Sequence, residues 1–304
     1  MNLINNTITK LKAVMAAENI KENEPMKNHT SFQVGGPADL FVMPQSRDQL
    51  RAALKICKAS EKPVYIMGNG SNLIVRDNGY RGIIINTKAL SQVKTVGESL
   101  IAEPGISLKD LAKFALKERL TGLEFASGIP GSLGGAVTMN AGAYDGEMKG
   151  VIKSITVITE DGHLKTIPGD QCNFSYRTSI LQAHHWVLVS VEIALKNGDY
   201  QAIEEKMRDL NAQRQAKQPL EYPSAGSTFR RPEGYYAGKL IQDAGFGGFS
   251  IGGAQVSEKH SGFVINKGGA TAADILNLIG AIQAGVKEKF GVDLKTEVIV
   301  IGNE

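Results

Sequence analysis

The stretch GIPGSLGGAVTMNAG, at residues 128–142, decides which fold this chain is expected to adopt. It has the glycine spacing G-x-x-G-x-x-G-G, with apolar residues between the glycines. Because glycine lets a backbone come very close to another group, the run suits contact with a flat, partly apolar cofactor and its phosphates. The alternative is a loop packed tightly against a sheet, since glycine also marks plain close packing.

This run does not fit the dinucleotide-binding fingerprint of a Rossmann fold. That fingerprint follows a strand, opens a helix and is succeeded about twenty residues later by an acidic residue for the ribose. Here the preceding segment reads TGLEFASGIPG, and no second β-α-β unit follows. The sequence therefore favours a different kind of glycine-rich ligand site.

A second glycine loop lies upstream in VYIMGNGSNLIV, at residues 64–75, where a short apolar strand ends. Its candidate ligand-binding residues are Gly68, Asn69, Gly70, Ser71 and Asn72. Backbone N–H groups in such a loop can converge on a phosphate or pyrophosphate. A tight turn is the alternative, because Asn-Gly is common in turns. Two glycine loops in one chain favour a ligand that carries phosphate.

Composition restricts the class of protein. The 304 residues are 42% hydrophobic and 21% charged, which describes a globular chain of two or three domains and excludes disorder. The formal net charge of +3 is too small for a nucleic-acid footprint. Cys57 and Cys172 form no C-x-x-C pair, and the five histidines show no metal spacing, so no disulfide or metal site is expected. Without a signal peptide or a run of about 18 apolar residues, we expect a cytoplasmic protein with no membrane contact.

Helical and strand patterns alternate along the chain and then change character near residue 200. The patterns predict helices over residues 6–18, from Ser46, over 107–118, over 200–219, near 236–244 and from Thr271. They predict strands over residues 64–67, 83–86, 93–103, 150–167 (a hairpin turning at Asp161 and Gly162), 186–196, 263–266 and 295–302. The helix over 200–219 is interpreted as a link between domains.

A third group of candidate residues is polar and spread along the chain. Arg177, in SYRTS, offers a guanidinium that suits a carboxylate. Ser227 offers a hydroxyl on a glycine loop, and Glu297 is an acid within an apolar segment predicted as a strand. Taken singly, each has a plainer interpretation: a surface ion pair, a turn hydroxyl and an edge-strand charge.

At these motifs the chain resembles the UDP-N-acetylenolpyruvoylglucosamine reductase family, flavoenzymes that complete UDP-N-acetylmuramic acid in bacterial peptidoglycan synthesis. The matching segments cover nearly the whole chain: NHTSFQVGGPAD, MGNGSNLIV, GLEFASGIPGSLGGAVTMNAGAY, FSYRTS, PSAGSTFRRP, AGKLIQDAG, GGAQVSEKHSGFVIN and KTEVIVIG. So many ordered motifs are more specific than any one of them. The implied activity belongs to cell wall biogenesis, and hence to cell shape and cell division.

The resemblance implies an α+β fold, in which a two-lobed FAD-binding domain of the vanillyl-alcohol-oxidase type precedes a C-terminal α+β substrate-binding domain. The implied bounds are residues 1–62 for lobe 1, 63–200 for lobe 2 and 201–304 for the substrate domain. FAD is expected to bind noncovalently, with its pyrophosphate at residues 68–72. Along its pyrophosphate and isoalloxazine the resemblance implies Gly128, Ile129, Pro130, Gly131, Gly134, Gly135, Asn140, Ala141 and Gly142.

The resemblance also implies an NADPH-dependent reduction of UDP-N-acetylglucosamine enolpyruvate through FAD. Arg177 and Glu297 take the role of stabilising an enolate-like state, and Ser227 that of the proton donor. Tyr176, Arg231 and Lys239 are implied to bind the nucleotide diphosphate or to position the substrate. Only 50 positions separate Arg177 from Ser227, so the chain resembles the shorter subtype, which lacks a substrate-covering tyrosine loop.

Two other functions fit parts of the pattern. A flavoprotein of the same fold that oxidises an alcohol or sugar acid would keep the glycine loops but would not need Arg177, Ser227 and Glu297 together. A nucleotide-sugar binding module would keep the phosphate-binding glycines without turnover. No macromolecular partner is expected from so small a net charge.

Overall fold

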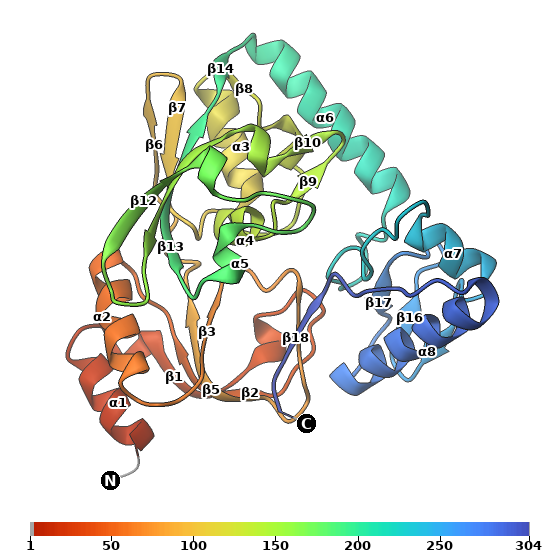
Figure 1. Ribbon diagram of the computed structural model, residues 1–304, viewed down its shortest axis with the longest axis horizontal. Coiled ribbons are helices and arrows are strands. Elements are labelled where there is room, and N and C mark those ends of the chain that lie inside the picture. Colours follow the sequence, from red (N-terminus) through yellow and green to blue (C-terminus); the bar gives the residue numbers. More distant parts are fainter. Residues whose placement is uncertain (1–2, 304) are drawn as a thin grey trace. The chain divides into compact units, whose positions relative to one another are not determined.

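The computed structural model describes residues 3–303, which divide into two compact units (Figure 1). Unit 1 consists of Met1–Glu22, Leu40–Asn69 and Gly82–Gln213. Unit 2 consists of Asn23–Asp39, Gly70–Arg81 and Arg214–Glu304. The chain therefore passes between the units several times, and the three-part division at residues 62 and 200 stays a prediction.

A five-stranded antiparallel sheet forms the centre of unit 1. Its strands, in spatial order, are β12 (Leu164–Pro168), β11 (Ile152–Ile158), β13 (Val187–Ala194), β7 (Ser99–Ala102) and β6 (Val93–Val96). The predicted hairpin is confirmed, because Ile158 pairs with Leu164 across a turn in which Gly162 has a φ of +86°. Val191 is fully buried between Ile155 and Ala102 of the neighbouring strands.

Helices of unit 1 pack on the apolar residues of this sheet. Helix α3 (Leu108–Lys117) begins, as predicted, at Ser107, whose side chain accepts a hydrogen bond from the backbone N–H of Asp110 at 3.0 Å. Helix α6 (Tyr200–Lys217) is also confirmed, and its buried residues Ile203 and Met207 join the same core. The remaining elements are β8 (Leu120–Thr121), α4 (Leu133–Thr138), β9 (Gly142–Ala143), β10 (Gly146–Glu147), α5 (Ile180–Ala183) and β14 (Lys196–Asn197).

The N-terminal third contains a four-stranded sheet with the order β1 (Ile20–Pro25), β2 (Pro37–Val42), β5 (Tyr80–Asn86) and β3 (Val64–Met67). Strands β3 and β5 are parallel, with Met67 opposite Asn86. Helices α1 (Leu3–Lys12) and α2 (Arg47–Lys58) bury apolar residues against this part of the core. The first helix was expected over residues 6–18, but it ends at Lys12, and Val14 lies exposed beyond it.

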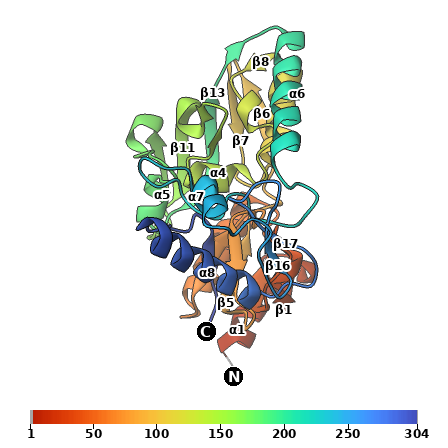
Figure 2. The ribbon, with the colours of Figure 1, turned by 90° about the vertical axis from the view of Figure 1, so that its right-hand side faces the viewer.

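Unit 2 contains a three-stranded sheet covered by its longest helix. The strands are β15 (Ser250–Ile251), β16 (Ala254–Val256) and β17 (Val264–Asn266), with α7 (Ala237–Asp243) and α8 (Ala272–Phe290) beside them (Figure 2). Strand β4 (Leu73–Val75) pairs in parallel with β18 (Ile299–Ile301). The terminal strand predicted over residues 295–302 is therefore shorter, and the expectation that Glu297 lies within it is wrong.

The two cysteines lie apart in the fold, Cys57 in α2 and Cys172 after β12. Both Cys57 and Cys172 are buried free thiols, and burial raises the pKa of Cys57 to about 12 and that of Cys172 to about 11. No helix among residues 3–303 combines the length and the apolar character that crossing a membrane requires.

Two carboxylates accept hydrogen bonds from the backbone N–H groups at the start of α8. At the predicted helix start, Thr271 and Asp274 form a capping box, with reciprocal hydrogen bonds of 3.0 Å each. Asp77 adds a second cap, because its two carboxylate oxygens accept from the N–H groups of Ala272 and Ala273 at 2.9 and 2.8 Å. The segment 70–81 is thereby fastened to the helix that carries much of the core of unit 2.

Replacing Asp77 with alanine is expected to lower the free energy of unfolding by about 1–2 kcal/mol, because two N–H groups of the helix lose a charged acceptor. Asp77→Asn, which keeps one acceptor oxygen, should cost less. Urea unfolding followed by circular dichroism measures both. The matched control is Asp209→Ala, at an exposed acid of α6. An equal loss in the control would contradict the capping role.

Candidate active site

The first glycine loop follows β3 and touches the second glycine run within unit 1. A β-carbon at Gly68 would lie 2.0 Å from the Oγ of Ser132, so only glycine fits there. The carbonyl of Gly68 accepts a hydrogen bond from the Nδ2 of Asn86 at 2.9 Å, which fixes the loop to the end of β5. The structure therefore brings two of the predicted ligand-binding segments side by side.

Asn69 offers a hydrogen-bonding group that no described residue uses. Its Oδ1 is buried and has no partner among residues 3–303. Buried polar atoms are nearly always hydrogen-bonded, so this acceptor is suited to a donor from a ligand. Gly70, the next residue, has a φ of +62°, which glycine adopts without strain.

The end of this loop belongs to unit 2. Gly70, Ser71 and Asn72 lie in the segment Gly70–Arg81. The Nδ2 of Asn72 donates to the carbonyl of Glu297 at 3.0 Å, and the N–H of Ile299 donates to the carbonyl of Asn72 at 3.0 Å. Two predicted site residues that lie 225 positions apart in the sequence are thus joined directly.

The sequence suggested that the second glycine run is a continuous loop. The structure differs, because the run contains the short helix α4. Ser132 is the N-cap of this helix and accepts from the N–H of Gly135 at 3.5 Å. The N–H of Gly134 donates to the carbonyl of Pro104 at 2.8 Å, and a β-carbon at Gly134 would lie 3.0 Å from that proline. A 3-10 helix (Glu124–Ala126), rather than a strand, precedes the run, which agrees with the exclusion of a Rossmann turn.

Asn140 ends the helical part of the run and uses its whole side-chain amide within unit 1. Its Nδ2 donates to the Oε2 of Glu147 at 3.0 Å and to the carbonyl of Ser175 at 3.1 Å. Its Oδ1 accepts from the N–H of Lys149 at 2.9 Å. The predicted cofactor-binding role of Asn140 can therefore involve its backbone, while its side chain joins three parts of the protein.

Arg177 lies at the tip of a tight turn. Ser175 and Thr178 exchange two backbone hydrogen bonds of 3.1 Å, which leaves Tyr176 and Arg177 between them. Arg177 has a φ of +55°, and its guanidinium carbon lies 5.0 Å from the centre of the Tyr176 ring. Non-glycine residues in this conformation are uncommon and concentrate at functional sites.

Ser227 and Glu297 lie on neighbouring segments of unit 2. Phe229 and Thr296 form an antiparallel bridge, and the N–H of Glu297 donates to the carbonyl of Thr228 at 2.8 Å. Ser227 is exposed, whereas Glu297 is half-buried. The structure thus brings together two of the three predicted catalytic residues, and Arg177 belongs to unit 1.

Arg231 and Lys239, the predicted substrate-binding cations, flank an exposed aromatic residue, Tyr236, in the sequence. The guanidinium of Arg231 lies 4.0 Å from the ring of Tyr236, which is 64% exposed. Lys239 pairs with Asp243 at 2.8 Å on α7. Sequence reasoning missed Tyr236, although an aromatic pair among basic residues, in RRPEGYYAGK, is a usable signal for a base-stacking surface.

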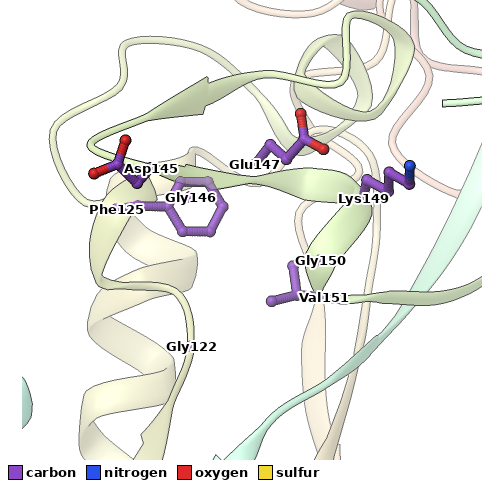
Figure 3. Close-up of a pocket in the computed structure, with 8 residues that line it drawn as sticks. All are labelled: Gly122, Phe125, Asp145, Gly146, Glu147, Lys149, Gly150 and Val151. Carbon is purple, nitrogen blue, oxygen red and sulfur yellow. The ribbon is translucent and has the colours of Figure 1, made fainter. Parts of the chain in front are cut away.

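Unit 1 also contains an open cavity of about 410 Å³, which none of the predicted site residues lines. Figure 3 shows its lining residues, which are Gly122, Phe125, Asp145, Gly146, Glu147, Lys149, Gly150 and Val151. Glu147 is the residue that also accepts the hydrogen bond from Asn140. Within residues 3–303 no group of three potential metal ligands occurs.

His260 lies next to the Ser227 segment and was not predicted. Its Nδ1 accepts from the N–H of Gly262 at 3.1 Å, and the carbonyl of Gly262 accepts from Thr228 at 2.9 Å. Burial lowers the pKa of His260 below its ordinary value. The neutral ring is thus the form that suits this contact.

Introducing a β-carbon at Gly68 is expected to separate the two glycine runs. Overpacking of this kind costs about 1–3 kcal/mol. Because the FAD that the sequence resemblance implies would need both runs in place, we expect its affinity to fall roughly tenfold or more. Flavin fluorescence quenching measures the affinity of Gly68→Ala. Adding Ser132→Ala, which removes the colliding hydroxyl, should restore part of it. Gly150→Ala serves as the control, because a β-carbon there meets nothing within 4 Å. Unchanged affinity in Gly68→Ala would contradict the contact.

The lowered pKa of His260 predicts a stability change at mildly acidic pH. The unfolded chain protonates this ring more readily, so its contribution is present above about pH 6.5 and is lost as the pH falls toward the folded pKa. Urea unfolding at pH 7.5 and 5.5 should therefore show a steeper loss in the wild-type protein than in His260→Gln. The same loss in both proteins would contradict the burial effect.

Two protein families match the sequence. Residues 218–301 match the C-terminal domain of UDP-N-acetylenolpyruvoylglucosamine reductase, and residues 38–167 match an FAD binding domain. A UDP-N-acetylenolpyruvoylglucosamine reductase of Clostridium botulinum (strain Hall) is 53% identical over 304 residues, which covers 100% of this chain and 99% of the relative.

Solved structures agree with these matches. The crystal structure of UDP-N-acetylenolpyruvylglucosamine reductase from Thermus caldophilus gives a TM-score of 0.80 at 32% identity, and covers 92% of this chain and 99% of that chain. An alkyldihydroxyacetonephosphate synthase gives a TM-score of 0.50 at 18% identity over 64% of this chain and 40% of its own, a likeness of fold alone. The expected α+β fold, with an FAD-binding domain of the vanillyl-alcohol-oxidase type and a C-terminal substrate domain, is confirmed.

Proposed function

The chain belongs to the UDP-N-acetylenolpyruvoylglucosamine reductase family, and from that premise we propose which of its residues carry the reaction. It is an FAD-dependent oxidoreductase of peptidoglycan synthesis with NADPH as the reductant. The proposed substrate is UDP-N-acetylglucosamine enolpyruvate, and the proposed product is UDP-N-acetylmuramate. The reaction is proposed to take place in the cytoplasm, without a nucleic-acid, membrane or obligate protein partner.

FAD is proposed to bind noncovalently to the two glycine runs. Two features fit FAD. The close approach at Gly68 suits a diphosphate, which binds to backbone N–H groups of such loops. The buried Oδ1 of Asn69, which has no partner among the described residues, can accept a hydrogen bond from a hydroxyl of the FAD ribityl chain. The N–H groups of Gly68, Asn69 and Gly70 are assigned to the pyrophosphate. The residues from Gly128 to Gly142 are assigned to the pyrophosphate and isoalloxazine. When bound there, FAD would supply the two-electron chemistry that links oxidation of NADPH to reduction of the substrate.

Arg177 and Glu297 are assigned to the substrate carboxylate. When a hydride adds to the terminal vinyl carbon of an enolpyruvyl ether, negative charge moves onto the carboxylate as an enolate-like state. A guanidinium that is always charged can bind both oxygens of that carboxylate and stabilise the charge as it develops. Glu297, whose own backbone is held by hydrogen bonds to Thr228 and Asn72, is assigned as the acid that acts on the same carboxylate.

Ser227 is assigned as the proton donor. The adjacent carbon of the enolate-like state must receive a proton on one face, and the serine Oγ–H donates it before solvent restores the hydroxyl. A hydroxyl is a weak acid, but the carbon it protonates is strongly basic. The observation that supports this assignment is the hydrogen bond from the N–H of Glu297 to the carbonyl of Thr228, because Ser227 is the residue before Thr228.

Tyr176, Arg231 and Lys239 are assigned to the nucleotide diphosphate and to substrate positioning. Arg231, seated against Tyr236, combines a cation for phosphate with an aromatic face for the base. The short interval between Arg177 and Ser227 consists of a short helix, β13, β14 and α6, which agrees with the proposed shorter subtype. An oxidase of the same fold is the second candidate function. It would explain the two glycine runs, but it would not need Ser227 and Glu297.

Replacing Ser227 with alanine is expected to separate the two halves of the reaction. Without oxygen, NADPH should bleach the flavin at the wild-type rate, because that half needs no proton from the serine. Addition of the enolpyruvyl substrate should then restore the absorbance roughly 10²–10⁴-fold more slowly. Ser224→Ala, in the same loop, is the control. Fast reoxidation in Ser227→Ala would refute the assignment, and a protein that only binds the sugar nucleotide would show neither half.

A further inference from the structure

Three segments of unit 1 meet at the side chain of Asn140. These are the end of the second glycine run, the β10 segment that carries Glu147, and the turn that presents Arg177. Asn140 is 1% exposed, and its three hydrogen bonds use both N–H groups and the carbonyl oxygen of the amide. A buried amide whose donors and acceptor are all hydrogen-bonded holds its partners in place. If one partner moved away, a buried polar atom would lose its hydrogen bond and have no water to replace it, which costs free energy.

The Arg177 turn needs such a fixed attachment. Arg177 holds a left-handed φ of +55°, which a β-carbon disfavours, so the surrounding contacts must maintain it. One contact is the hydrogen bond from Asn140 to the carbonyl of Ser175, the first residue of the turn. The second is the hydrogen bond of 2.8 Å from the Oγ of Ser179 to the carbonyl of Thr138, just past the last residue of the turn. Both run to the last residues of the second glycine run.

Asn140 is itself suited to this place. It has a φ of +41°, a region in which asparagine is enriched among the non-glycine residues. Glu147, which accepts its second N–H, lies on the edge of the cavity shown in Figure 3. The amide therefore connects the backbone assigned to FAD with the backbone that carries the arginine.

We propose that Asn140 is a positioning residue for Arg177, which it holds at a set place relative to the second glycine run. The inference rests on the proposed role of Arg177 and adds that this role depends on the amide of Asn140. A guanidinium that shifts by about 1 Å binds the developing charge less well, and such displacements cost up to roughly 100-fold in rate. Reduction of the flavin by NADPH, which the proposed function does not assign to Arg177, should not depend on Asn140.

Asn140→Gly tests the proposal with little backbone strain, because glycine accepts the same left-handed conformation. In the FAD-loaded variant, flavin reoxidation by the enolpyruvyl substrate should slow by about tenfold or more relative to flavin reduction by NADPH. Asn23→Gly is the matched control, an exposed asparagine with a φ of +50°. Asn140→Asp, which keeps the size of the side chain, is measured in parallel in case the glycine variant folds poorly.

Two further readouts distinguish positioning from a purely structural role. Hydrogen exchange of the amides of residues 175–179 should become faster in Asn140→Gly, in the flavin-free protein as well as in the loaded one. On an Arg177→Lys background, Asn140→Gly should slow reoxidation by less than about twofold further, because both changes act on one group.

The outcomes separate the inference from the function on which it rests. Slow reoxidation in Arg177→Lys with normal rates in both Asn140 variants overturns the inference alone. The inference is also overturned if the reoxidation losses of Asn140→Gly and Arg177→Lys multiply when the two changes are combined. It is likewise overturned if Asn140→Gly loses FAD and slows flavin reduction and reoxidation equally. Normal reoxidation in Arg177→Lys contradicts the proposed role of the arginine, and the inference with it.

Discussion

The contact between Gly68 and Ser132 is the constraint on which the rest of unit 1 depends. A β-carbon at residue 68 would lie 2.0 Å from the serine Oγ, so the two glycine runs can meet only because one of them has no side chain there. Ser132 in turn caps α4, and the residues at the end of α4 hold the Arg177 turn through Asn140 and Thr138. A single close approach is therefore connected, through a short series of hydrogen bonds, to the residue assigned to the substrate carboxylate.

In unit 2, backbone pairing brings together the segments that carry Ser227 and Glu297. Ser227 and Glu297 are distant in sequence, yet the bridge between Phe229 and Thr296 lines up their segments, and Asn72 binds the carbonyl of Glu297. The segment 70–81 that brings Asn72 is fastened to α8 by Asp77. The proposed chemistry needs an acid and a proton donor at fixed places, and main-chain hydrogen bonds supply that rigidity better than exposed side-chain contacts do.

Sequence patterns predicted what local physics controls. The capping box at Thr271, the hairpin at Gly162 and the long helix over 200–217 are all found, because each depends on residues close together in the chain. The strand expected around Glu297 was wrong, since an alternating apolar pattern does not say where its pairing partner ends. The hydrogen bonds of Asn140 and the cation–π contact of the exposed Tyr236 join residues that are not adjacent in the chain, which no local pattern contains. The family resemblance, carried by many ordered motifs, was confirmed by the relatives.

The most direct measurement is an anaerobic titration of the purified wild-type protein, in which flavin absorbance and product mass are followed together. The account predicts that NADPH bleaches a bound flavin and that UDP-N-acetylglucosamine enolpyruvate restores it in equal amount. The product should then be two hydrogens heavier than the substrate. A protein that carries no flavin, or whose reduced flavin is reoxidised by oxygen but not by the enolpyruvyl compound, would contradict the account.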